Sequence, residues 1–180
     1  MKNFLLIFFL FFIFTENVLS EIKGKLDQLF IELKTNDKTT SEIEQEIWKL
    51  WSTHPNDKKL TKLLAKGSEY VNNHQFSEAI ETFTDVINLD PKWAEAWNKR
   101  ATVLYLIGEF QKSQNDIDKV LELESRHFGA LAGQGLVNIQ LKNYEKAIIS
   151  YKKALEIYPS MKSPETMIEK IEELIKKDSI

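Results

Sequence analysis

The sequence predicts an all-α protein, a right-handed α-solenoid built from antiparallel helix pairs. Three observations lead to this prediction. A set of residue types recurs at a constant interval through the middle of the 180-residue chain. Small residues occupy the two places in each period where paired helices would have to approach closely. Apolar residues at helical spacing flank the repeats on both sides, as expected of helices that cover the ends of a stack.

The period is continuous and has no gaps. Phe76, Phe110 and Tyr144 are equally spaced along the chain. Three further sets keep the same spacing: a small residue, a large core residue, and a residue that closes the second helix. These sets are Ala79, Ser113 and Ala147; Phe83, Ile117 and Tyr151; and Pro91, Ser125 and Pro159. Two helical stretches in a period of about 34 residues predict helix–turn–helix repeats over 60–93, 94–127 and 128–161.

Each repeat is expected to pack its two helices through small residues. Gly67, Ala101 and Gly135 stand at one position of the first helix, and Ala79, Ser113 and Ala147 at one position of the second. Proline after the second helix prevents its continuation. Gly129 and Gly133 lie four apart on one helical face, which indicates close approach of another backbone, either a neighbouring repeat or a bound peptide.

The flanking segments are predicted to be helical covers. Residues 21–59 form a hairpin, with apolar residues at helical spacing from Leu26 to Leu33 and again from Ile43 to Trp51. The interval from Ile47 to Phe83 is slightly longer than one period, which favours a degenerate repeat, and an unrelated hairpin is the alternative. Residues 162–180 form a C-terminal capping helix with one apolar face.

Residues 1–20 have the pattern of a signal peptide. Lys2 precedes an apolar run from Phe4 to Phe14, which is too short to span a bilayer. Cleavage is expected between Ser20 and Glu21; an uncleaved anchor or a buried helix is the alternative. The Lys-, Asn- and Ile-rich composition suggests a bacterial source, so export would lead to the periplasm. Membrane contact is expected only through a partner or an uncleaved signal segment.

Composition argues against several classes of function. The chain has no cysteine, which excludes disulfides, thiolate nucleophiles and cysteine-based metal sites. A net charge of −3 argues against a nucleic-acid binder. His54, His74 and His127 share no repeat position and form no zinc-type pair, and no motif joins a nucleophile to a base. We expect no enzyme activity, no cofactor, no metal and no small-molecule substrate.

The repeat resembles the tetratricopeptide repeat (TPR) family over residues 60–161. A closer resemblance is to small exported TPR proteins of alphaproteobacteria. It rests on three segments, which are Ala94–Thr102, Asp116–Ile117 and Leu121–Leu131. Ser125 stands where that group usually has proline.

The resemblance implies a concave groove lined by the first helix of each repeat. The partner-binding residues that it implies are Leu64, Ser68, Asn72, Glu95, Asn98, Thr102, Tyr105, Gly129 and Leu136, with Arg126 and His127 at the rim. Arg126 and His127 are expected to have a structural role; holding an acidic group of a partner is the alternative. Chaperone-binding members of the family grip a peptide carboxylate with Lys, Arg and Asn. The matching positions here are Leu64, Ser68, Thr102, Gly129 and Gly133, which argue against that clamp.

The expected function is therefore a non-catalytic protein–protein interaction module, or adaptor, in the bacterial cell envelope, which holds a peptide or a partner protein in the groove. The alternative is a structural subunit that docks on an envelope complex through its convex face or its N-terminal hairpin. Exposed side chains at Trp48 and Trp51 would favour this alternative.

Overall fold

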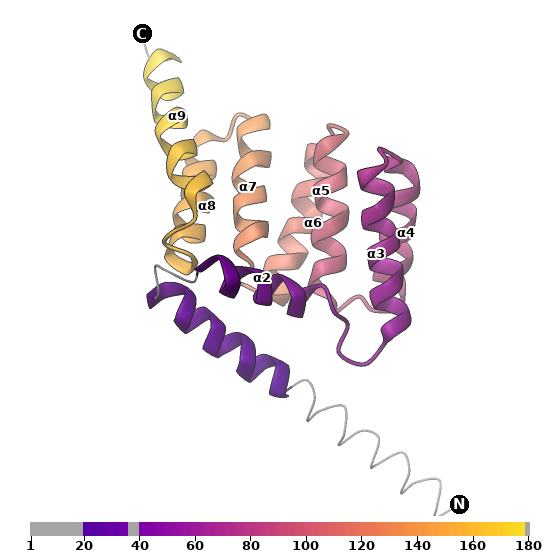
Figure 1. Cartoon of the computed structure of the whole chain (residues 1–180). Coiled ribbons are helices and arrows are strands. Elements are labelled where there is room, and N and C mark those ends of the chain that lie inside the picture. The colour runs from indigo at the N-terminus through magenta and orange to yellow at the C-terminus, as the bar shows by residue number, and fades with distance from the viewer. Residues whose placement is uncertain (1–19, 36–39, 179–180) are drawn as a thin grey trace, which may run out of the picture. The chain divides into compact units, whose positions relative to one another are not determined.

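The computed structural model describes residues 20–35 and 40–178, and all its regular elements there are helices (Figure 1). This confirms the predicted all-α class. The chain divides into two compact units, one up to Thr61 and one from Lys62 onward. The predicted signal peptide, residues 1–20, lies outside the described residues except for Ser20.

The first unit contains the expected helical hairpin. A helix over 20–35 pairs with α2 (Thr40–Trp51). The rings of Phe30 and Trp51 lie 5.9 Å apart between the two helices, and Lys25 forms an ion pair with Glu46. Trp51 is only 7% exposed and Trp48 is half-buried. These tryptophans therefore do not form the exposed surface that would favour docking through the hairpin.

α3 (Lys58–Asn72) begins with a side-chain cap. Asp57 Oδ1 accepts hydrogen bonds from the backbone N–H groups of Lys59 at 2.7 Å and Leu60 at 3.2 Å. These bonds satisfy donors that the first turn of a helix leaves unpaired. They also lower the pKa of Asp57, because they favour its ionised form.

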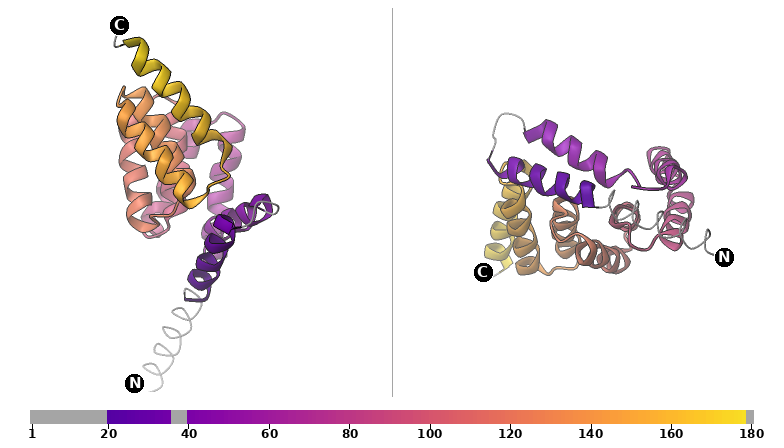
Figure 2. Two further views of the ribbon diagram at one scale, coloured as in Figure 1. Left: turned by 90° about the vertical axis from the view of Figure 1, so that its left-hand side faces the viewer. Right: turned by 90° about the horizontal axis from the view of Figure 1, so that it is seen from below.

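The second unit is a row of helix pairs that follow one another in chain order (Figure 1). After most of α3 come α4 (Phe76–Leu89) and α5 (Ala94–Leu106), then α6 (Phe110–Leu123), α7 (Phe128–Gln140) and α8 (Tyr144–Ile157). α9 (Lys162–Asp178) packs along α8 at the end of the row (Figure 2, left). The second helices end just before Pro91, Ser125 and Pro159, as the sequence predicts.

The small residues of the period are explained by close helix packing. A Cβ atom added to Gly67 would overlap the ring of Phe83, and one added to Gly135 would lie 2.5 Å from Cζ of Tyr151. In the middle repeat, Ser113 Oγ donates a 2.8 Å hydrogen bond to the carbonyl of Ala101. The departure from alanine at Ser113 is therefore accommodated, because its buried hydroxyl has a partner on the paired helix.

The capping helix closes the far end of this unit. Ile171 is buried together with Ala147 and Tyr151 of α8. Other apolar residues of α9, among them Met167 and Ile168, are half-buried against the same cluster. Among the described helices, none combines the length and the apolar character needed to cross a membrane.

Tyr151→Phe is expected to stabilise the protein by ~1 kcal/mol. The Tyr151 hydroxyl is buried with no hydrogen-bond partner among the described residues, and burial raises the pKa of this group. Phe83 already occupies the corresponding position of the first repeat, opposite Gly67, so the ring alone fits such a site. Chemical denaturation of the two proteins measures the change. A clear loss of stability would show that the hydroxyl has a partner in solution.

Candidate functional site

A pocket between α5 and α7 gathers much of the predicted groove. Asn98, Thr102 and Tyr105 form one face of α5, and Gly129, Gly133 and Leu136 form one face of α7. Both sets follow the spacing i, i+4, i+7, which places their members on one side of a helix. The pocket between them has a volume of about 70 Å³. Its remaining lining is mostly apolar: Ala101, Ser113, Ile117, Ala130 and Val137.

Polar groups at this pocket retain unused hydrogen-bonding capacity. Thr102 Oγ1 donates to the carbonyl of Asn98 at 3.0 Å, which leaves the hydroxyl oxygen as an acceptor. The Tyr105 hydroxyl accepts from Gln140 Nε2 at 3.5 Å, which leaves its own proton for an acceptor. The Tyr105 ring is held by Phe110, whose centroid lies 5.5 Å away. The pocket thus combines an apolar floor with one donor and one acceptor at its edge.

Gly133 leaves space in this pocket and is not needed for helix packing. A Cβ atom there would meet only Ile117 Cδ1, at an ordinary contact distance of 3.7 Å. The expected close approach of a neighbouring repeat therefore does not occur at Gly133.

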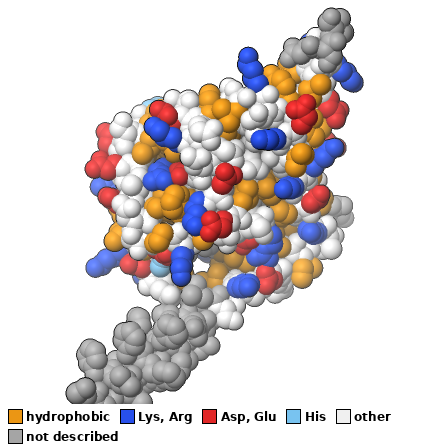
Figure 3. All heavy atoms as spheres, turned by 180° about the vertical axis from the view of Figure 1, so that it is seen from behind, with side chains coloured by type: hydrophobic (Ala, Val, Ile, Leu, Met, Phe, Trp, Pro, Cys, Tyr) orange, Lys and Arg blue, Asp and Glu red, His pale blue; other side chains and the backbone are white. Residues whose placement is uncertain are grey.

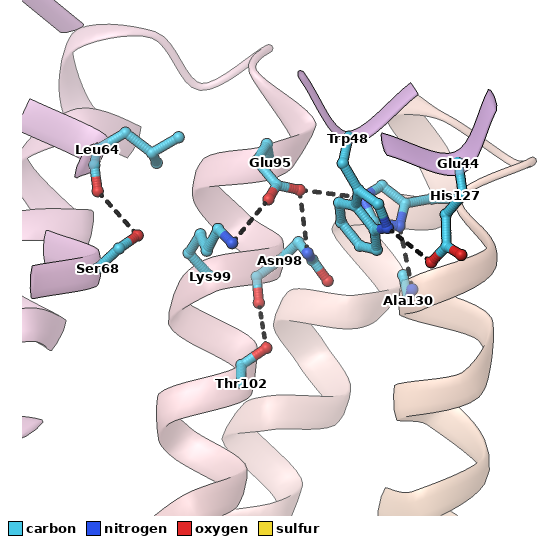
Figure 4. A network of polar contacts seen from close by, with 10 residues as sticks. All are labelled: Glu44, Trp48, Leu64, Ser68, Glu95, Asn98, Lys99, Thr102, His127 and Ala130. Atoms are coloured by element: carbon cyan, nitrogen blue, oxygen red, sulfur yellow. Dashed lines mark hydrogen bonds and ion pairs between the residues drawn. The ribbon is translucent and has the colours of Figure 1, made fainter. Parts of the chain in front are cut away.

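Glu95 and His127 do not line the groove surface, which corrects the sequence-based expectation for both residues. Their side chains are 1% and 0% exposed, and His127 Nε2 lies 3.1 Å from Glu95 Oε2 (Figure 4). His127 is the N-cap of α7, where its Nδ1 accepts from the backbone N–H of Ala130 at 3.0 Å. Within the protein, His127 Nε2 and Glu95 Oε2 thus pair with each other, and the other carboxylate oxygen, Oε1, lies 3.2 Å from Lys99 Nζ. The acidic group that His127 contacts is therefore Glu95 of the same chain and not a group of a partner.

The electrostatics of this pair favour an ionised Glu95. Burial, which is the largest effect on this group, opposes ionisation and raises its pKa. The hydrogen bond from His127 and the nearby charge of Lys99, whose Nζ lies 3.2 Å from Glu95 Oε1, outweigh burial, so the pKa of Glu95 lies below its usual value. Asn98 Nδ2 also donates to Glu95 Oε2, at 3.0 Å.

The other predicted residues lie outside the α5–α7 pocket. Leu64 is only 2% exposed and belongs to the core, which corrects its assignment to the groove surface. Ser68 is half-buried and donates to the carbonyl of Leu64 at 3.2 Å, and Asn72 is exposed at the end of α3. Arg126 makes two hydrogen bonds of 2.9 Å to the side-chain carboxylate of Glu124, two residues earlier in the same chain.

Sequence reasoning missed the pairing of Glu95 with His127. The only signal available was their position at the start and the end of the second repeat, 32 residues apart. Within the part of the chain that the structure describes, no group of three or more His, Asp or Glu side chains is arranged to hold a metal ion.

Comparison with known proteins identifies the family. Two models of the tetratricopeptide repeat match, over residues 64–113 and 128–161. A TPR repeat-containing protein of the alphaproteobacterium Rhizobium etli is 31% identical over 160 residues, which cover 87% of this chain and 78% of the relative. The chain therefore belongs to the tetratricopeptide repeat family.

More distant similarities show the fold alone. Hsp70-Hsp90 organizing protein 1 of Glycine max is 26% identical over 129 residues, and the match covers only 22% of that longer protein. The first TPR domain of Spaghetti (RPAP3), solved with the HSP90 peptide SRMEEVD, superposes with a TM-score of 0.65 at 22% identity and covers 67% of this chain and 96% of that domain. MamA gives a TM-score of 0.61 at 23% identity, over 76% of this chain and 84% of its own.

Proposed function

We propose that this protein is a non-catalytic adaptor that holds a peptide or a partner protein in the groove between the first helices of its repeats. The observation that carries the proposal is the α5–α7 pocket. Five residues expected to line the groove meet there, and an internal glycine keeps it open. Apolar walls with a few polar groups at the edge suit a peptide that inserts one side chain and offers its backbone to Thr102 and Tyr105.

TPR domains among the structural neighbours were solved with HSP90 and HSP70 peptides, which supports a peptide as the ligand class. The ligand proposed here differs from these in its charge. The positions that would supply the carboxylate clamp hold Leu64, Ser68, Thr102, Gly129 and Gly133, none of which is cationic. We therefore propose an anchor side chain that is uncharged, and we expect no binding of the acidic peptide SRMEEVD in a fluorescence anisotropy titration.

Tyr105→Ala is expected to preserve the fold and to lower the affinity for a groove ligand by tenfold or more, which corresponds to roughly 1.4 kcal/mol or more of binding free energy. The reason is that a half-buried ring at the edge of the pocket supplies much of the contact area. The partner is first captured in cells of the source organism with a photo-cross-linking residue at position 105 or 112. Lys112 lies on α6 and does not line the pocket. An adduct formed only at position 105 supports the groove.

Adducts formed only at position 112, or an equal loss of thermal stability in Tyr105→Ala and Ala147→Leu, would refute the site. The second result would show that Tyr105 is a core residue, since Ala147 is fully buried between α8 and its neighbours. Overpacking at Ala147 is expected to cost about 1–3 kcal/mol.

We further propose that the protein works in the bacterial envelope, after export to the periplasm. The support is the pattern of residues 1–20, with a basic start and an unbroken apolar run from Phe4 to Phe14. N-terminal sequencing of the protein from the source organism should begin at Glu21. A mature protein that begins at Met1 and fractionates with the cytosol would contradict the proposal.

A further inference from the structure

Two pockets at the second helices of the repeats are related by the period of the sequence. The first, called here the charged pocket, lies among α4, α5 and α6; the second, the amide pocket, lies among α6, α7 and α8. Each has a volume of about 400 Å³. Every residue that lines the charged pocket has its counterpart, one period later in the sequence, in the lining of the amide pocket. Their chemistry can therefore be compared position by position.

In the charged pocket, an arginine is already paired with other residues of the lining. Arg100 donates two hydrogen bonds of 2.8 Å to Asp116 and one of 3.0 Å to Thr84. A bidentate pair of this kind is geometrically fixed and uses most of the guanidinium donors. The charged pocket has little polar capacity left for a ligand at this point.

In the amide pocket, the residues at the three corresponding positions are also joined by hydrogen bonds, but a neutral side chain stands in place of the arginine. Gln134 replaces the arginine: its Oε1 accepts from Ser150 Oγ at 2.9 Å, and its Nε2 donates to Asp118 Oδ1 at 3.4 Å. Gln114 also donates to Asp118, at 2.7 Å, and its buried Oε1 has no hydrogen-bond partner among the described residues. Asn143 is the N-cap residue of α8, yet its side chain makes no capping bond.

The lining indicates what the amide pocket binds. Half of the residues around it are carboxamides, a side-chain group that contains both a donor and an acceptor, as a peptide group does. Ile149, 53% exposed, adds an apolar contact. Asp118 and Lys146 are of opposite sign, so the pocket attracts neither polyanions nor polycations. No aromatic ring lines it, which disfavours sugars and bases that bind by stacking.

We propose that the amide pocket binds an extended, uncharged peptide segment. Carboxamides such as Gln114 and Asn143 pair with the peptide backbone, and an apolar side chain of the ligand packs on Ile149. This site is separate from the proposed groove. On α7 the amide pocket uses Gln134 and Asn138, whereas the α5–α7 pocket uses Gly133 and Leu136, which lie on a different side of the helix.

Charges of both signs are mixed on the one face of the molecule that Figure 3 draws. Figure 3 shows one face of the molecule, where acidic, basic and apolar side chains of the described residues are interspersed and neither charge forms a large area. An extended segment of uncharged peptide can approach such a surface without a desolvated charge.

To test the proposal, peptides that bind the purified protein are selected from a phage-displayed library of random dodecapeptides. The affinity of each enriched peptide is then measured by fluorescence anisotropy. Ile149→Glu places a charge in the amide pocket. Asn115→Glu places the same charge at the equivalent position of the preceding repeat, in the charged pocket, and is the matched control. Both positions are exposed, so both variants are expected to fold, which thermal melting verifies.

The expected result is a set of peptides that bind the wild type and Asn115→Glu alike and bind Ile149→Glu about tenfold or more weakly. Tyr105→Ala should leave their binding unchanged, which separates this site from the groove. The proposal is overturned if no selected peptide is sensitive to Ile149→Glu, or if sensitivity follows Tyr105→Ala instead. Chitotetraose binding that is lost in Ile149→Glu, without any selected peptide, would assign the pocket to a saccharide and also overturn it.

Discussion

Gly135→Ala is expected to destabilise the protein by about 1–3 kcal/mol, although alanine is the better helix former by ~1 kcal/mol. The added Cβ atom would lie 2.5 Å from Cζ and 2.7 Å from both Cε atoms of Tyr151. The overlap is with a ring that is 1% exposed and is enclosed between α7, α8 and α9. Relief of the overlap requires the two helix backbones to separate, because the ring has no free space to enter.

Gly133→Ala is the matched control for this prediction. The same substitution two residues earlier in α7 meets only Ile117 Cδ1 at 3.7 Å, so the helix propensity of alanine should raise stability by up to ~1 kcal/mol. Urea unfolding of the two variants measures both changes. A similar change in both would mean that the close contact of Gly135 with Tyr151 is absent in solution.

The control also bears on the groove. Gly133 lines the α5–α7 pocket, and a methyl group there reduces a volume of only about 70 Å³. We expect Gly133→Ala to weaken a groove ligand while it stabilises the protein. This glycine would then be retained at a cost to stability because the pocket needs the space.

The sequence is a good guide to this fold because the period fixes the register of every helix. Gly67 and Gly135, found from spacing alone, lie against Phe83 and Tyr151. The positions 98, 102 and 105, which the family resemblance assigns to the groove, share one side of α5 because of their spacing. These predictions depend only on local geometry, which residue order determines.

Other features depend on which side chains meet across helices, and residue order does not show this. Glu95 occupies a position that resemblance assigns to the surface, and its burial follows from a histidine 32 residues away. In the amide pocket, hydrogen bonds join Gln134 of α7 to Asp118 of α6 and to Ser150 of α8, and each of these pairs is 16 residues apart in the sequence. No single-helix pattern marks them, so the amide pocket was not found from the sequence.

Glu95→Gln is expected to destabilise the protein by about 1.5–3 kcal/mol at pH 7, because it removes the charge from a buried hydrogen bond. His127 Nδ1 accepts from the N–H of Ala130, so the proton of the neutral ring is on Nε2 and faces Glu95. A neutral amide oxygen still accepts this bond, but it loses the interaction of the carboxylate with Lys99. Glu124→Gln is the control: its half-buried pair with Arg126 should contribute at most ~1 kcal/mol.

The effect of Glu95→Gln should also depend on pH in a defined direction. The pKa of Glu95 is lower in the folded protein than its usual value of 4.5, because His127 and Lys99 outweigh the effect of burial. The unfolded chain therefore binds more protons around that pH, and the stability due to the carboxylate is complete above 4.5 and is lost as pH falls through the folded pKa. The difference in unfolding free energy between wild type and Glu95→Gln should be constant at higher pH and should shrink below 4.5. A difference that stays constant to pH values well below this would show that folding does not lower the pKa of Glu95, and would contradict the stabilisation of its carboxylate by His127 and Lys99.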